Sequence, residues 1–149
     1  MRVVIGADEV LPIAADVVAS VRELGSETIL VGPLAGDEIE WAEVAGEVGR
    51  RVACAAADWG IAMCWSGTGV AIAANKVPGV RAALCGDAET ARLARRYNHA
   101  NVLALSMRMT SSAVAVEIVQ AFAAAPYGTE DFDLRNVERV SALEPRAAE

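Results

Sequence analysis

The chain has 149 residues, a formal net charge of −7 and a hydrophobic content of 54%. This length suits one domain with a substantial core. The negative charge argues against a nucleic-acid surface, which needs clustered Lys and Arg. No apolar run approaches the ~20 residues of a membrane span, and the short apolar start before Asp8 and Glu9 is unlike a signal peptide. We therefore expect a cytoplasmic protein without a nucleic-acid or membrane partner.

Short apolar runs alternate with helical patterns along the chain, as in a parallel sheet with crossover helices. The apolar runs predict strands at 2–7, 28–31, 61–64, 80–85 and 102–105. The helical patterns lie at 12–24, about 40–56, 70–75, 88–96, 111–124 and 134–143. No repeat or linker divides the chain. The sequence therefore predicts a single three-layer, Rossmann-like α/β domain over residues 1–149, with a five-stranded parallel sheet.

A thiol and a glycine-rich turn follow the third predicted strand. The strand ends at Cys64, and Gly67 and Gly69 free the backbone to turn into a helix. Ligands of parallel sheets bind outside the carboxyl ends of the strands, where we expect Asp8, Cys64 and the Asn98 region to lie. A base followed by free amides at a helix N-terminus can abstract a proton and hold the resulting charge. An enolising enzyme needs this arrangement, although a cysteine such as Cys64, taken alone, is more often an inert buried thiol than a catalytic one.

Other motifs point away from metals, cofactors and disulfides. The cysteines Cys54, Cys64 and Cys85 contain no Cys-x-x-Cys pair, which argues against a zinc site or a disulfide framework. The single histidine, His99, has no other ligand types nearby. The turn around Gly67 lacks the third glycine of a dinucleotide-binding loop. We expect neither a metal nor a cofactor.

Three arginines are candidates for an anion site. Arg135 and Arg139 are spaced i, i+4 and share one face of the last predicted helix, while Arg108 follows the fifth predicted strand. Arginine binds phosphate through paired hydrogen bonds. These three residues predict a phosphate pocket, with plain solvent exposure as the alternative.

Several ordered blocks of the chain carry a family resemblance. The segment from Cys64 to Lys76 reads Cys-Trp-Ser-Gly-Thr-Gly and later Ala-Ala-Asn-Lys. Further blocks lie at 3–8, 80–85, 89–95, 98–105 and 135–140. Together they resemble, over nearly the whole chain, the ribose-5-phosphate isomerase B / galactose-6-phosphate isomerase family. Its members interconvert aldose and ketose phosphates through a cis-enediolate, without a metal.

The resemblance implies roles by position. Cys64 is expected to move the proton between C1 and C2 of a small phosphorylated sugar, and the loop of Ser66, Gly67 and Gly69 to hold the enediolate. The residues expected to line the substrate site are Asp8, Glu9, Trp41, Tyr97, Asn98, His99, Arg108, Arg135 and Arg139. Family members share sites between subunits. We therefore expect a homodimer or homotetramer in which the C-terminal segment 127–149 reaches a neighbouring subunit.

Three positions depart from the family pattern. Glu9 stands where the family has a histidine near the phosphate, and a carboxylate there repels a dianion unless an arginine pairs with it. Trp41 lies where the family has Asp-Tyr-Pro, which alters the sugar pocket. Tyr97 replaces the histidine thought to open the sugar ring.

These departures leave the substrate open. A four-carbon sugar 4-phosphate cannot close into a five- or six-membered ring, so its isomerase needs no ring opener. Alternatively, His99 or Asp8 opens the ring and ribose 5-phosphate is the substrate. A supporting subunit of a heteromeric isomerase, a sugar-phosphate-binding protein and an enzyme for an unphosphorylated or carboxylated sugar are further alternatives.

Overall fold

The computed structural model describes residues 1–144 and contains one wholly parallel sheet in the order β2-β1-β3-β5-β4. The strands are β1 (Arg2–Ala7), β2 (Glu27–Val31), β3 (Trp59–Cys64), β4 (Ala82–Leu84) and β5 (Val102–Ser106). The predicted five-stranded parallel sheet is confirmed. The predicted strand at 80–85 shortens to β4 because the N–H of Arg81 donates to the side chain of Asn101 rather than to a strand.

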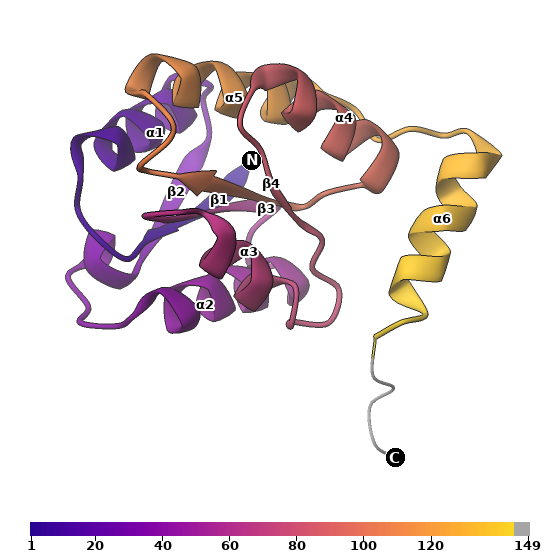
Figure 1. Cartoon of the computed structure of the whole chain (residues 1–149), viewed down its shortest axis with the longest axis horizontal. Coiled ribbons are helices and arrows are strands. Elements are labelled where there is room, and N and C mark those ends of the chain that lie inside the picture. The colour runs from indigo at the N-terminus through magenta and orange to yellow at the C-terminus, as the bar shows by residue number, and fades with distance from the viewer. Residues whose placement is uncertain (145–149) are drawn as a thin grey trace.

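Helices cover both faces of the sheet, which confirms the three-layer prediction (Figure 1). One core cluster joins the sheet to α1 (Pro12–Glu23), α4 (Ala88–Asn98) and α5 (Ser112–Ala124). The other joins it to α2 (Trp41–Ala53) and α3 (Thr68–Ala74). A short 3-10 helix, η1 (Gly32–Ala35), follows β2. Among residues 1–144, no helix is long and apolar enough to cross a membrane.

Two strand glycines bring α2 close to the sheet. A Cβ on Gly6 would come within 2.6 Å of Val44, and one on Gly60 within 2.7 Å of Val48. Both valines are fully buried on α2. The absence of these side chains lets α2 pack directly on β1 and β3, and so positions Trp41 at the start of the helix.

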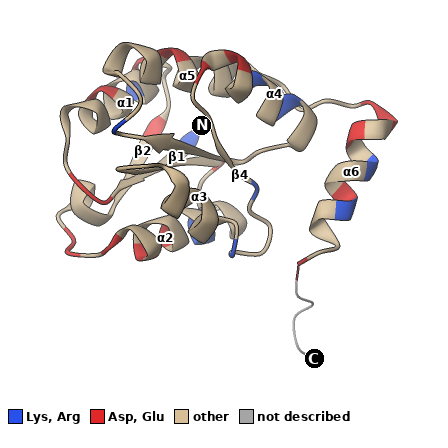
Figure 2. Ribbon diagram, in the orientation of Figure 1, with Lys and Arg blue, Asp and Glu red and all other residues tan. Residues whose placement is uncertain are grey.

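Helix α6 (Asp131–Ser141) stands apart from the three layers, beyond α4 (Figure 1). It begins three residues before the predicted start at 134, since acidic residues in the first turn favour a helix N-terminus. Figure 2 shows that acidic and basic residues are interspersed along this helix. Its apolar side chains Phe132, Leu134 and Val140 are exposed, Phe132 to 68%. Residues 145–149 of the predicted C-terminal segment lie outside the described residues.

Candidate active site

The carboxyl ends of three neighbouring strands form the candidate active site. Asp8 directly follows β1, Cys64 ends β3, and Arg108 follows β5 by two residues. The backbone N–H of Asp8 donates to the carbonyl of Met63 at 3.3 Å, which ties the first two strand ends together. The structure thus places Asp8, Cys64 and Arg108 at one edge of the sheet, where a ligand of a parallel sheet binds.

The thiol of Cys64 is oriented by the turn that follows it. Cys64 is only 4% exposed, and its Sγ accepts a hydrogen bond from the N–H of Gly67 at 3.2 Å. Gly67 has φ +75°, and a Cβ there would come within 2.8 Å of the backbone of Leu105 and Ser106. Only glycine satisfies both the left-handed backbone and this close approach. The turn therefore lies directly on the end of β5 and directs an amide at the sulfur.

The amides of the next turn open toward the same edge. Helix α3 begins at Thr68, two residues before the predicted start, so the first-turn N–H groups of Thr68 and Gly69 have no partner within the helix. The hydroxyls of Ser66 and Thr68 lie 2.7 Å apart in one hydrogen bond. Backbone amides beside a buried thiol can stabilise an oxyanion that forms there.

Asp8 carries an unused hydrogen-bonding atom at this edge. Its Oδ1 is buried and has no hydrogen-bond partner within the described chain. Burial, and then the neighbouring charge of Glu9, raise the pKa of Asp8 above its ordinary value. Glu9 itself is exposed. A partnerless carboxyl oxygen at the strand end next to that of Cys64 suits a ligand hydroxyl.

Trp41 forms one wall of the turn. It is the first residue of α2, whose start is held by a hydrogen bond from the N–H of Glu40 to the carboxylate of Glu43 at 3.4 Å. A Cβ on Gly69 would come within 2.9 Å of the Trp41 ring. The indole therefore packs on Gly69, while 44% of the residue stays exposed. The structure joins Trp41 to the Cys64 turn.

The Asn98 region lies elsewhere, and the expectation that it shares the Cys64 edge is wrong. Asn98 ends α4, four residues before β5 begins at Val102. Because α4 runs back against the strand direction, Tyr97 and Asn98 lie at the amino ends of the strands. The N–H of Asn101 donates to the carbonyl of Arg81 at this opposite edge.

His99 is held by the segment that leads to α6. Its ring stacks on Tyr127 with centroids 4.5 Å apart, and its Nε2 lies 2.9 Å from the carbonyl of Gly128. Its own carbonyl accepts a hydrogen bond from Arg81. The only histidine of the chain thus links α4 to the chain leading into α6.

The arginines of α6 belong to the Asn98 side of the molecule. Arg135 and Arg139 are both exposed, on the helix that stands beside α4 (Figure 1). A cavity of about 280 Å³ there is lined by residues from α4 and α6 that include Tyr97, Asn98 and Asn136. The expected site residues thus form two groups. The Cys64 group has Asp8, Glu9, Trp41, Cys64, Ser66, Gly67, Gly69 and Arg108, and the Asn98 group has Tyr97, Asn98, His99, Arg135 and Arg139.

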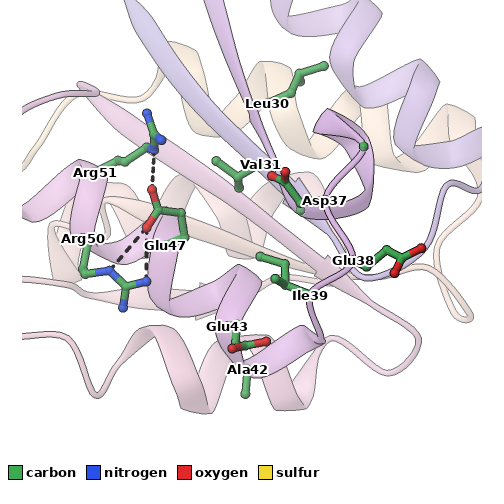
Figure 3. Close-up of a pocket in the computed structure, with 12 residues that line it drawn as sticks. Leu30, Val31, Asp37, Glu38, Ile39, Ala42, Glu43, Glu47, Arg50 and Arg51 are labelled. Carbon is green, nitrogen blue, oxygen red and sulfur yellow. Dashed lines mark hydrogen bonds and ion pairs between the residues drawn. The ribbon is translucent and has the colours of Figure 1, made fainter.

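A further cavity of about 1020 Å³ lies along α2 and the loop before it (Figure 3). Within it Glu47 is bound by Arg51 at 2.7 Å and by Arg50 at 3.1 Å. These contacts, above all the hydrogen bond from Arg51, lower the pKa of Glu47. Both arginines of this cavity are already paired with Glu47, its other charged side chains are the acidic Asp37, Glu38 and Glu43, and it holds no thiol, so it is not the candidate site.

Sequence reasoning missed Ser106, the last residue of β5. Its Oγ donates to the carbonyl of Trp65 at 2.9 Å and accepts from the N–H of Met109 at 3.1 Å. The only sequence signal was a hydroxyl at a strand end within an otherwise apolar run.

Comparison with known proteins decides the family. The family model described as Ribose/Galactose Isomerase matches residues 3–143. The chain belongs to the ribose/galactose isomerase family. Ribose-5-phosphate isomerase B of Escherichia coli (strain K12) is 34% identical, with 97% of each chain covered. The corresponding protein of Mycobacterium tuberculosis (strain CDC 1551 / Oshkosh) is 32% identical over 97% of this chain and 90% of its own length.

Solved structures of ribose/galactose isomerases share the fold. The type B ribose 5-phosphate isomerase of Trypanosoma brucei superposes with a TM-score of 0.90 at 44% identity, covering 96% of this chain and 98% of its own. The Mycoplasma genitalium ribose-5-phosphate isomerase B, solved with bound ribulose-5-phosphate, gives 0.87 at 30% identity over 95% and 94%. The family resemblance drawn from the motifs is confirmed, and with it the enzyme class.

Proposed function

We propose that this protein is an aldose–ketose isomerase that converts a sugar phosphate through a cis-enediolate. The contact between the Gly67 amide and the Cys64 thiol supports the proposal most, because it joins the thiol to the turn whose next amides, at Thr68 and Gly69, have no partner within their helix. Cys64 removes a proton from the carbon beside the sugar carbonyl, and the C–H electron pair forms the enediolate double bond. The turn amides hold the charged oxygen. The proton then returns to the former carbonyl carbon, while the hydroxyl proton on the adjacent oxygen passes to the former carbonyl oxygen, which completes the exchange of aldose and ketose.

Asp8 and Arg108 flank this reaction centre. The free Oδ1 of Asp8 accepts a hydrogen bond from a sugar hydroxyl. Arg108 follows the end of β5, and its side chain, which contacts the sulfur of Met109 at 3.2 Å, is exposed. Its guanidinium suits the phosphate, and it also offsets the negative charge of Glu9.

A second copy of the chain completes the site. Within one chain the Cys64 group and the Asn98 group lie at opposite edges of the sheet, too far apart to act on one small substrate. Helix α6 stands away from the layers (Figure 1). Its exposed side chains Phe132, Leu134 and Val140 offer apolar surface that a partner chain would bury. We propose a homodimer or homotetramer in which α6 and the following residues reach the neighbour and bring Arg135 and Arg139 to its Cys64.

Two sugar phosphates compete as substrate. The family names favour ribose 5-phosphate, which exists mainly as a ring. Here Tyr97 stands at the ring-opening position. The ring of His99 already stacks on Tyr127 and hydrogen-bonds with the carbonyl of Gly128. A phenol in place of the imidazole, together with an engaged His99, suits a sugar that is already open. We therefore keep a four-carbon sugar 4-phosphate as the second candidate.

The purified protein alone tests the proposal. Ketose formation is measured with erythrose 4-phosphate, ribose 5-phosphate, allose 6-phosphate and galactose 6-phosphate. Turnover of any of them supports an independent isomerase and contradicts a supporting subunit or a mere binder. Turnover of none contradicts the proposal. The free thiols of Cys54, Cys64 and Cys85 fit a reducing compartment, so we place the reaction in the cytoplasm.

A further inference from the structure

The end of β5 and the Cys64 turn are joined by a small hydrogen-bond network. The carbonyl of Cys64 accepts the N–H of Met107 at 3.0 Å, and the carbonyl of Trp65 accepts the N–H of Arg108 at 3.0 Å. These two bonds continue the pairing of β3 with β5 beyond the strand ends. The turn that carries the thiol and the turn that carries Arg108 therefore share one backbone frame.

Ser106 closes this frame with its side chain. Its hydroxyl donates to the carbonyl of Trp65 at 2.9 Å and accepts the N–H of Met109 at 3.1 Å. Its own carbonyl accepts the N–H of Thr110 at 3.2 Å. Ser106 is only 6% exposed, so water does not replace these bonds. One buried hydroxyl thus bridges the Cys64 turn on one side and the turn of residues 107–110 on the other.

The bridge leaves little freedom for the turn it holds. Gly67 lies against the Leu105–Ser106 peptide, where a Cβ would come within 2.8 Å of Ser106 N. The amide of Gly67 in turn donates to the sulfur of Cys64. A shift of the Ser106 hydroxyl therefore moves the carbonyl of Trp65, the turn and the amide at the thiol together.

We propose that Ser106 is a positioning residue of the isomerase, which fixes the Cys64 turn relative to Arg108 through its hydroxyl bridge between Trp65 and Met109. This inference rests on the proposed function for its link to catalysis. Ser106 does not touch the reacting atoms. It sets the distance between the base and the phosphate-binding arginine, a quantity on which rate depends steeply.

The bridge is tested first in the unaltered protein. Met109 is 74% exposed, yet its N–H donates to Ser106. We expect this amide to be protected from hydrogen exchange, as measured by NMR, far above an exposed loop amide. Exchange at the rate of a free amide would overturn the bridge without any variant having to fold.

The positioning role is tested with Ser106→Ala, and with Ser106→Thr as the variant that keeps the hydroxyl. The matched control is Ser20→Ala, since Ser20 is also buried but its hydroxyl has no hydrogen-bond partner among residues 1–144. We expect Ser106→Ala to lower kcat about ten-fold and to raise KM. Ser106→Thr should recover most of the loss, and Ser20→Ala should match the wild type.

Alkylation of Cys64 by iodoacetamide, followed by mass spectrometry of its peptide, measures how accessible the thiol is and needs no substrate. We expect faster labelling in Ser106→Ala, because the turn over the buried thiol loosens, and wild-type labelling in Ser20→Ala. Wild-type labelling and wild-type kcat in a folded Ser106→Ala protein would overturn the inference. If no sugar phosphate is turned over even by the wild type, the proposed function fails, while labelling and Met109 exchange still decide the bridge.

Discussion

Gly69 and Trp41 are in direct contact, although they are 28 residues apart in the chain: a Cβ on Gly69 would come within 2.9 Å of the indole Cε3. Gly69 lies in the first turn of α3 and Trp41 starts α2. The glycine thus sets how closely the aromatic wall approaches the Cys64 turn. This contact joins the two helices on one face of the sheet at the point where the substrate is expected.

Gly69→Ala is expected to raise KM several-fold, because the new methyl group displaces the Trp41 ring. The free energy of unfolding should fall by only about 1 kcal/mol, since a partly exposed ring can move outward. Steady-state kinetics and chemical denaturation measure the two effects. A double-mutant cycle with Trp41→Ala provides the control: Gly69→Ala should then become nearly neutral, and full additivity would contradict the contact.

Gly67→Ala is expected to cost about 3 kcal/mol of unfolding free energy, from the left-handed backbone and from overlap with the β5 backbone together. Gly25→Ala is the matched control. Gly25 has φ +74° against +75° for Gly67, but a Cβ at Gly25 would have no atom of residues 1–144 within 4 Å, its two neighbours in the sequence aside. The control should cost about 1 kcal/mol. Denaturant unfolding measures both losses of free energy. Equal losses for Gly67→Ala and Gly25→Ala would show that the Gly67 turn is not in close contact with β5.

Asp8→Asn is expected to raise the melting temperature at pH 7. Burial raises the pKa of Asp8 in the folded protein above 3.8, so folding favours the protonated form and the charged form costs stability above the folded pKa. Below the unfolded pKa both states are protonated and the cost disappears. The advantage of the asparagine should therefore shrink as pH falls toward 3.8.

Thermal unfolding from pH 7 to pH 4 measures this trend, and kcat/KM should fall in the same variant because the contact to the sugar weakens. A lower melting temperature than wild type at pH 7 would mean that the carboxylate makes a favourable contact in the folded protein.

Mixing two inactive variants tests the shared site. Cys64→Ala lacks the base, and Arg139→Ala lacks a phosphate ligand that we assign to the neighbour. A hybrid dimer contains one site with both residues intact, so unfolding and refolding an equal mixture should restore about a quarter of wild-type activity. Each variant refolded alone is the control. No recovery, in a mixture shown to form hybrids, would place both residues in one chain.

The strands and their parallel sheet were predictable because apolar runs between helical patterns have few other solutions. It was harder to predict at which edge of the sheet Asn98 lies. Its place depends on how far α4 extends: Asn98 ends the helix and therefore sits at the amino ends of the strands. The family motif predicts that Asn98 and Cys64 contact one substrate, but it does not indicate that the two residues lie at opposite edges of the sheet within one chain.

No pattern in the sequence predicted the hydrogen-bond bridge made by Ser106. One serine after an apolar run is common, and its meaning comes from two backbone groups, at Trp65 and Met109, that only the folded chain brings to it. The exposed apolar side chains of α6 were not predicted; the family resemblance implied only that segment 127–149 reaches a neighbouring subunit, and a helix with Phe132 and Leu134 fits a core equally well.

The most direct test of the central claim is solvent deuterium incorporation, followed by NMR in D2O for the wild type and Cys64→Ala. With a sugar phosphate that the protein accepts, we expect the wild type to introduce deuterium at the carbon next to the carbonyl. Cys64→Ala should introduce none while remaining folded. Incorporation by Cys64→Ala at the wild-type rate would contradict Cys64 as the base, and with it our account of the site.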